Sequence, residues 1–264
     1  MISHFTAWRG VRPLVLAVAA AGLAGCATSE MAGGGSGAHP DLSGFWNIGR
    51  PIAERDPELV SLIPEGTVFM DDAGGPEFVV GDYGGLILTP YAEEVAENWK
   101  PTDDFTMSLA CATPSIAYSM QGPFPFEIYQ SDDFIIIRME YFDVVRIIFM
   151  DGRGHPGEDA PHYPAGHSIG HWEGDILVVD TTHIEPYTLT NNGLYHSDQL
   201  HVIERFKLSD DGQMLMATQE YEDPVTLQNR GYRFISWDKG AEDDQVYPYD
   251  CDPSFALNYG AAEQ

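Results

Sequence analysis

Short apolar segments separated by turn residues fill the second half of the chain and limit it to a β-rich fold. They are rich in β-branched and aromatic residues, which is typical of strands, and they span 126–130, 134–140, 144–150, 176–182, 200–208, 214–221 and 231–237. Between two of them, Ser209-Asp210-Asp211-Gly212 is a strong hairpin signal. With about eight strands joined by short turns, the chain is predicted to be all-β, an antiparallel barrel or, alternatively, a β-sandwich.

Upstream of the strands we expect one or two short helices, of which one is readily recognised. Thr89 is placed to cap it, and a proline follows at the first helical position. Tyr91, Val95 and Trp99 then recur at helical spacing, which places them on one face. Residues 50–85 are rich in Pro, Gly and acidic residues, so we expect them to be irregular apart from short extended pieces.

The first and last expected strands carry features that resemble the lipocalins. Gly44-Phe45-Trp46 is similar to the Gly-x-Trp at the first strand of those proteins. Arg233 is similar to the arginine of their last strand, which would pack on Trp46. The resemblance implies a closed, lipocalin-like barrel rather than a sandwich. A barrel of about eight strands has room for one small ligand.

The N-terminus has the organisation of a bacterial lipoprotein signal. Arg9 and Arg12 precede a short apolar run, and Leu23-Ala24-Gly25-Cys26 matches the lipobox of such proteins. The run is shorter than the roughly 20 residues that a membrane-spanning helix needs. We expect three parts: a signal peptide at 1–25, a lipidated tether at 26–39 that begins with Cys26, and a single β domain at 40–264.

Lipidation sets the expected location, and charge sets the expected partners. Ala27 follows the cysteine, which resembles the pattern of lipoproteins held on the periplasmic side of the bacterial outer membrane. The net charge of −28 repels nucleic acid and anionic lipid. The expected partners are therefore a small-molecule ligand and, through the lipid anchor only, the membrane. Nucleic acid is not an expected partner.

Two cysteines remain if Cys26 carries the lipid. Cys111 and Cys251 form an even pair in an oxidising compartment, which predicts one disulfide between the middle of the chain and its end. A free buried thiol at either position is the alternative.

Histidines gather in the middle of the chain, where seven of the nine lie between residues 155 and 201. Histidine titrates near neutral pH and is the commonest metal ligand, so the gathering suggests a site. Neither His-Glu-x-x-His nor Cys-x-x-Cys is present. The sequence therefore leaves open whether a divalent metal is a cofactor, and the candidate ligands for it are His155, His167 and His196. Asp198 or Glu204 would join them. We expect the other histidines to be surface or hydrogen-bonded structural residues: His162, His171, His183 and His201.

Gly166-His167-Ser168-Ile169-Gly170 has the Gly-x-Ser-x-Gly pattern of the nucleophile elbow of α/β-hydrolases. Such an elbow needs a buried strand before it and a helix after it. Here a segment rich in Pro and His precedes the pattern, and the turn at 172–175 follows it. We therefore expect no nucleophile at Ser168 and expect the glycines to serve tight backbone bends.

Several segments resemble a large family of uncharacterised exported bacterial proteins. Its signature reads Gly-His-Ser-x-Gly-x-Trp-Glu-Gly-Asp-x-Leu-Val-Val-x-Thr, which residues 166–181 match, and further matches lie at 40–46, 123–128, 151–156 and 196–205. The family reads Cys-His-Glu-Gly-Asn near its end, where this chain has Cys251-Asp252-Pro253-Ser254-Phe255. The resemblance implies no activity, but it places six candidate residues in the family pattern: His155, His167, His196, Asp198, Glu204 and Arg205.

Three functions are compatible with these patterns. The first is a binding module whose barrel takes up a small, largely apolar ligand, with a polar rim from His167 and His196. Its further candidate ligand-binding residues are Glu127, Arg146, His155, Trp172 and Arg205. The second is a histidine- or metal-dependent hydrolase, lyase or isomerase acting on a small molecule. Its candidate catalytic residues are His167, His196, Asp198 and Glu204. The third is a structural envelope lipoprotein.

Overall fold

The structure is a computed structural model that describes residues 39–49, 55–71, 78–104, 106 and 109–259. The expected signal peptide, the lipidation site Cys26 and the tether up to residue 38 lie outside the described residues. The helices are α1 (Pro57–Ser61), α2 (Pro90–Asn98), α3 (Pro101–Asp104), α4 (Ile116–Ser119) and α5 (Ala256–Tyr259). The strands are β1 (Gly44–Ile48), β2 (Val68–Phe69), β3 (Phe126–Gln130), β4 (Phe134–Met139), β5 (Val145–Phe149), β6 (His167–Glu173), β7 (Ile176–Thr182), β8 (Tyr187–Thr190), β9 (Leu194–His196), β10 (His201–Leu208), β11 (Met214–Glu222) and β12 (Gly231–Lys239).

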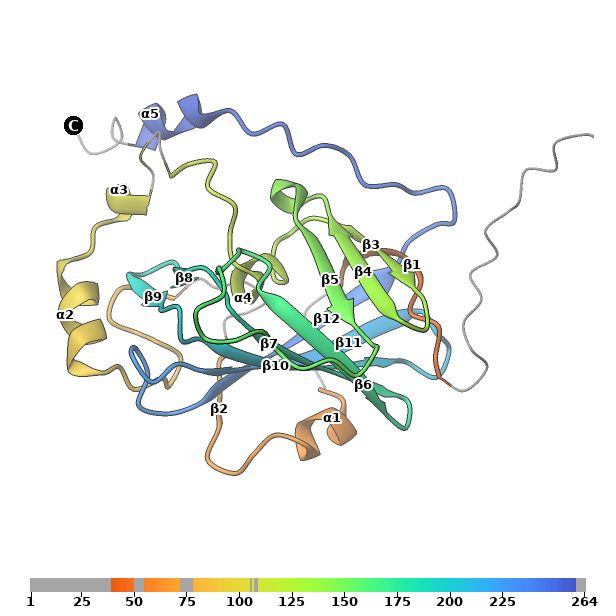
Figure 1. Cartoon of the computed structure of the whole chain (residues 1–264). Helices are drawn as coiled ribbons and strands as arrows, with labels where there is room; N and C mark the ends of the chain where they lie inside the picture. Colours follow the sequence, from red (N-terminus) through yellow and green to blue (C-terminus); the bar gives the residue numbers. More distant parts are fainter. Residues whose placement is uncertain (1–38, 50–54, 72–77, 105, 107–108, 260–264) are drawn as a thin grey trace, which may run out of the picture. The chain divides into compact units, whose positions relative to one another are not determined.

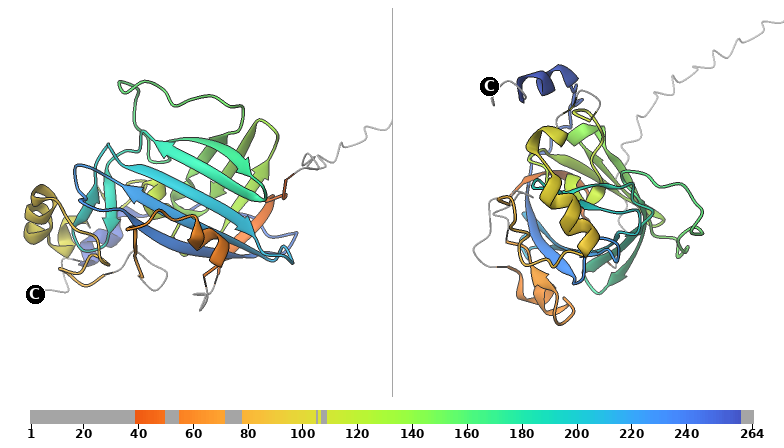
Figure 2. Two further views of the ribbon diagram at one scale, coloured as in Figure 1. Left: turned by 90° about the horizontal axis from the view of Figure 1, so that it is seen from below. Right: turned by 90° about the vertical axis from the view of Figure 1, so that its left-hand side faces the viewer.

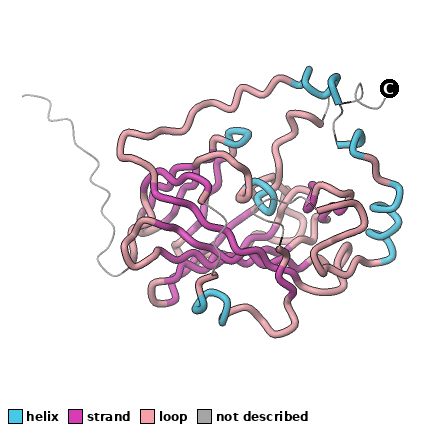
Figure 3. Tube along the Cα trace, turned by 180° about the vertical axis from the view of Figure 1, so that it is seen from behind, coloured by secondary structure: helices cyan, strands magenta, loops and turns pink. Residues whose placement is uncertain are grey.

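Nine of the described strands form a closed barrel, which confirms the predicted all-β, lipocalin-like fold (Figure 1). Their order is β1-β3-β4-β5-β6-β7-β10-β11-β12, and pairing of β1 with β12 closes the ring. The short strand β2 adds to β12 in parallel, and β8 and β9 form a separate hairpin. Strands dominate the centre of the molecule, and most helices lie at its periphery (Figure 3).

One junction in the barrel is parallel, between β5 and β6. Parallel neighbours cannot be joined by a tight turn, because the chain must return to the end of the sheet from which it started. The connection here runs over residues 150–166 and projects from the barrel wall (Figure 2). The antiparallel order of strands expected from the sequence is therefore interrupted at this junction, where a long loop connects the two strands.

Side chains alternate between the inside and the outside of the barrel along each strand. On β7, Leu177 and Val179 belong to the main core, whereas Val178 packs outside in a second, smaller cluster. Helix α1 covers that outer cluster with Leu59, and Lys207 Nζ lies 2.8 Å from a carboxylate oxygen of Asp56 at the start of the helix. Helix α1 differs from the expectation for this part of the chain, because its single turn falls within residues 50–85, which were predicted to be irregular.

Helix α2 forms at the predicted place, and the Thr89 side chain accepts a hydrogen bond from the backbone of Ala92 as a cap. Its buried face differs from the expected one. Ala92 and Ala96 are buried, whereas Tyr91 is 62% exposed. The helix packs closely on the rest of the domain through these small alanines. The larger side chains of Tyr91 and Val95 therefore border a cleft that is described below.

Lys239 packs on Trp46, whereas the lipocalin-like features predicted Arg233 at this place. The register of β1 and β12 places Lys239 opposite Trp46, and its Nζ lies 5.4 Å from the centre of that ring system. Arg233 lies farther along β12 inside the barrel, where its guanidinium carbon is 5.1 Å from the ring centre of Tyr221.

Cys111 and Cys251 are joined by a disulfide with a sulfur–sulfur distance of 2.00 Å, across 140 positions of sequence. It fastens the C-terminal segment to the loop that precedes α4. Among the described residues, no helix has the length and the apolar character needed to cross a bilayer.

Candidate functional site

The connection between β5 and β6 and the outer face of β5 enclose a groove of about 670 Å³, called here the outer groove. Its walls are mostly apolar and include Val145, Ile147, Phe149, Pro161, Tyr163 and Pro164. His167, the first residue of β6, lines the groove as well. An apolar groove of this size with a few polar groups is typical of a small-molecule site.

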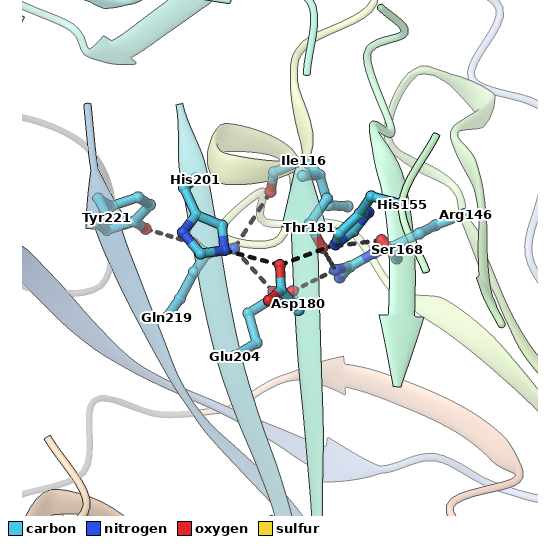
Figure 4. A network of polar contacts seen from close by, with 10 residues as sticks. All are labelled: Ile116, Arg146, His155, Ser168, Asp180, Thr181, His201, Glu204, Gln219 and Tyr221. Carbon is cyan, nitrogen blue, oxygen red and sulfur yellow. Dashed lines mark hydrogen bonds and ion pairs between the residues drawn. The ribbon is translucent and has the colours of Figure 1, made fainter. Parts of the chain in front are cut away.

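Behind His167, four side chains form a continuous row of hydrogen bonds, called here the histidine chain. His167 Nδ1 lies 2.9 Å from His155 Nδ1, and His155 Nε2 lies 3.0 Å from Asp180 Oδ1. His201 Nε2 reaches the same carboxylate oxygen at 2.7 Å. Figure 4 shows Asp180 between the rings of His155 and His201.

Strand register brings these residues together. Asp180 on β7 is opposite Ile169 of β6 and Ile203 of β10, so His167 and His201 are its diagonal neighbours on the outer face. His155 comes from the long connection between β5 and β6. The site therefore depends on the parallel junction, because a tight β5–β6 hairpin would have no loop to supply this histidine.

The hydrogen bonds determine which ring nitrogens carry protons. The Asp180 carboxylate only accepts hydrogen bonds, so His155 and His201 donate to it from Nε2. A neutral His155 then accepts at Nδ1, which requires His167 to donate from its own Nδ1. His167 Nε2 is left with a lone pair, and no hydrogen bond joins this atom to another residue in the described ranges.

The surroundings favour the neutral form of His167. Burial lowers its pKa, and electrostatic repulsion from Arg153, and from His155 and His183 in their protonated forms, acts in the same direction. At Asp180, burial opposes ionisation, but the hydrogen bonds and charges of His201 and His155 outweigh this and lower its pKa. The hydrogen bond to Asp180 raises the pKa of His201. A neutral imidazole at the groove, connected to an ionised carboxylate, is the arrangement of a general base.

The ring of His167 is held in place from two sides. Phe149 stacks on it with ring centres 5.3 Å apart, and His155 meets it edge-on at 5.1 Å. Arg153 in turn packs on the Phe149 ring, with its guanidinium carbon 3.8 Å from the ring centre. These contacts fix the orientation of the imidazole before a ligand arrives, which lowers the entropic cost of using it.

Strained backbone borders the same region. Phe142 (φ 52°) and Asp143 (φ 54°) line the outer groove, and His183 (φ 55°) follows β7. The ring of His183 packs on His162 with centres 5.2 Å apart, and its Nε2 meets the Gly157 carbonyl at 3.1 Å. Positive φ at bulky residues is costly and is often found at functional sites.

Arg146 and Glu204, two of the candidate residues, lie inside the barrel on the other side of the sheet from the histidine chain (Figure 4). Arg146 Nη2 forms an ion pair with Glu204, and its Nε donates to Ser168 Oγ at 3.0 Å. Thr181 Oγ1 accepts from Arg146 at 2.9 Å. Glu204 is thus engaged in a buried structural pair. Ser168 is fully buried within the same network, in agreement with the argument against a nucleophile there.

His196 and Asp198 lie elsewhere, at a cleft between α2 and the β8–β9 hairpin. His196 is 1% exposed, with Nε2 2.7 Å from Ser115 Oγ and Nδ1 3.0 Å from the Ser197 carbonyl oxygen. Burial lowers its pKa to about 4. With both nitrogens engaged, its ring positions α4 against the hairpin and offers no lone pair to a ligand. Asp198 is exposed at the mouth of this cleft.

The remaining candidates make local contacts outside the outer groove. Glu127 accepts a hydrogen bond from Tyr129 Oη at 2.8 Å, and Trp172 stacks on His39 with ring centres 4.9 Å apart. Arg205 forms an ion pair with Glu220. Of the predicted site residues, only His155 and His167 belong to the histidine chain.

Asp180 and His201 complete the site, and the sequence analysis did not single them out for it. His201 is expected there to be a surface or hydrogen-bonded structural residue. Alternation along β7 and β10 places both on the outer face, but only the register between the strands shows that they meet. Within the described ranges, no group of three or more His, Cys, Asp or Glu is arranged to hold a metal ion.

No protein-family model matches the chain, and comparison with curated proteins finds no match.

Proposed function

We propose that the protein binds a small, largely apolar molecule in the outer groove and that His167 exchanges a proton with it, as in a lyase or an isomerase. The observation that carries this proposal is the free Nε2 lone pair of His167 at an apolar groove, connected through His155 to the Asp180 carboxylate. A purely structural histidine pair would not require an apolar groove beside it or strained backbone along its edge.

The proposed step is a proton transfer. A substrate in the groove gives a proton to His167 Nε2, and the imidazolium that forms keeps its Nδ1 proton directed at His155. The negative charge of Asp180, two hydrogen bonds away, stabilises the positive charge along the row. Return of the proton to a different atom gives isomerisation, and loss of a leaving group gives elimination.

The location belongs to the same proposal. The lipobox around Cys26 supports export and lipid anchoring, with residues 40–264 forming the β domain on the periplasmic side of an outer membrane. We propose that the chain belongs to the family of exported bacterial proteins whose signature residues 166–181 match. An anchored domain of this kind meets small molecules that enter the periplasm, which suits a groove open on the outer wall of the barrel.

Replacement of His167 by Gln is expected to abolish proton abstraction. The assay follows deuterium uptake at the α-carbons of small cyclic ketones in D₂O by NMR, which needs no knowledge of the natural substrate. We expect wild-type protein to accelerate uptake and His167→Gln to lose about 10²–10⁴-fold of the acceleration. The matched control is His171→Gln, because His171 is an exposed histidine on the same strand. Equal rates for wild type and His167→Gln would refute the proposal.

Asp180 is proposed as a positioning residue, and Asp180→Asn tests it. Loss of the carboxylate is expected to lower the pKa of His201, which the Asp180 hydrogen bond raises, and to slow deuterium uptake about tenfold. The readouts are the NMR titration of the His201 ring protons and the pH profile of the uptake rate. Asp175→Asn, in an exposed turn, is the control. An unchanged His201 titration would contradict the role of Asp180 in the histidine chain.

Ligand binding without chemistry is the second candidate function. The closed barrel and the apolar walls of the outer groove favour it independently of His167. The neutral dye Nile red separates the two candidates. The carrier function is supported if Nile red binds, if Ile147→Ser weakens that binding, and if the protein accelerates proton exchange of no ketone. The protein is then a carrier rather than an enzyme.

A further inference from the structure

A second cleft lies between α2 and the β8–β9 hairpin, away from the residues of the outer groove. Figure 1 shows these elements at one end of the barrel. It consists of two adjoining pockets of about 490 Å³ each. Tyr91, Val95 and Tyr195 line both pockets, which together are called here the cap cleft.

Aromatic rings form much of its wall. Tyr91 and Trp99 come from α2 and its end, and Tyr187 and Tyr195 come from the β8–β9 hairpin. Gly193 (φ +92°) allows the two sides to approach, because a Cβ at this position would lie 2.6 Å from Trp99 Cβ. A positive φ together with this lack of space makes glycine the residue that fits here.

The charged side chains on the wall are all acidic. Glu94 and Asp103 line one pocket, and Asp198 lines the other. The lining residues of both pockets include no Lys and no Arg. His196 is the single histidine among them, and its burial keeps it neutral near pH 7.

We propose that the cap cleft binds a small organic cation, such as a quaternary ammonium compound. The faces of aromatic rings attract cations, and recognition of quaternary ammonium groups by several rings is a common use of this attraction. The three carboxylates add Coulomb attraction, and the net charge of −28 raises the concentration of cations near the surface. An anion would be repelled, and a neutral apolar molecule would gain nothing from the acids.

This proposal is independent of the outer groove, because the two sites share no lining residue. The two also differ in character. The outer groove offers a base to a largely apolar molecule, whereas the cap cleft offers aromatic faces and negative charge. Binding at the cap cleft is therefore expected to persist in the His167→Gln variant.

The experiment compares choline with 3,3-dimethylbutan-1-ol, a neutral molecule of the same shape, by NMR titration at low ionic strength. We expect choline to bind at least tenfold more tightly than the alcohol, and we expect added salt to weaken choline binding alone. Equal affinity for the two molecules would overturn the proposal, because it would show an apolar pocket that is indifferent to charge.

Variants locate the binding. Tyr91→Ala and Asp198→Asn are both at exposed positions and are each expected to weaken choline binding about three- to tenfold. The controls are Tyr247→Ala and Asp210→Asn, an exposed tyrosine and an exposed turn aspartate that line neither pocket. Equal losses in the controls, or none in the two cleft variants, would show that choline binds elsewhere and would overturn the proposal.

Discussion

Replacement of Arg146 by Met is expected to lower the free energy of unfolding by about 3–5 kcal/mol, which is a large part of the stability of a typical domain. Arg146 is fully buried and paired with Glu204, which is itself 1% exposed. Removal of the arginine leaves a carboxylate in the barrel interior without its counter-charge, and Ser168 and Thr181 also lose a donor. Urea denaturation monitored by tryptophan fluorescence measures the change.

Two comparisons identify the cause of this loss. Arg138→Met removes a 47% exposed arginine from its pair with Glu127 on the outer face, and it is expected to cost no more than about 1 kcal/mol. The double variant Arg146→Met, Glu204→Met removes both buried charges and is expected to recover part of the loss. A cost below about 1 kcal/mol for Arg146→Met would show that the pair is not buried as described.

Acidification is expected to destabilise the protein through His196. Burial lowers the pKa of this residue to about 4, against about 6.5 in the unfolded chain. Between these values the unfolded state binds a proton that the folded state does not, so stability falls as the pH falls from 6.5 to 4 and then levels off. The difference between a pKa of about 6.5 and one of about 4 corresponds to about 3 kcal/mol.

The variant His196→Gln isolates this contribution. It loses the titrating group, and we expect it to be less stable than wild type at pH 7, because the contact with Ser115 changes. Its stability should nevertheless fall less steeply between pH 6.5 and 4. His201 works in the opposite direction, because its raised pKa contributes stability that is lost as the pH rises. Identical pH dependence of wild type and His196→Gln would contradict the assignment.

The candidate site was only partly predictable, and His155 and His167 show why. Their clustering in the sequence and the sequence signature indicated both residues, and the structure places them in contact. His196 shares both indications but is fully buried beside Ser115, where it organises the cap cleft. Residue type and spacing do not distinguish a histidine that faces a groove from one whose two nitrogens are both engaged.

The local sequence by itself determined strands β3, β4, β5, β7, β10, β11 and β12, the capped helix α2 and the all-β character, because alternation, turn residues and capping act over a few neighbouring positions. Tertiary structure alone decided the closure of β1 on β12, the parallel junction of β5 with β6, and the placement of Lys239 rather than Arg233 over Trp46. Strand register is set by contacts between segments far apart in sequence, and a shift of one residue would move every side chain to the other face. For that reason the meeting of Asp180 with His155 and His201 became visible only once the barrel was closed.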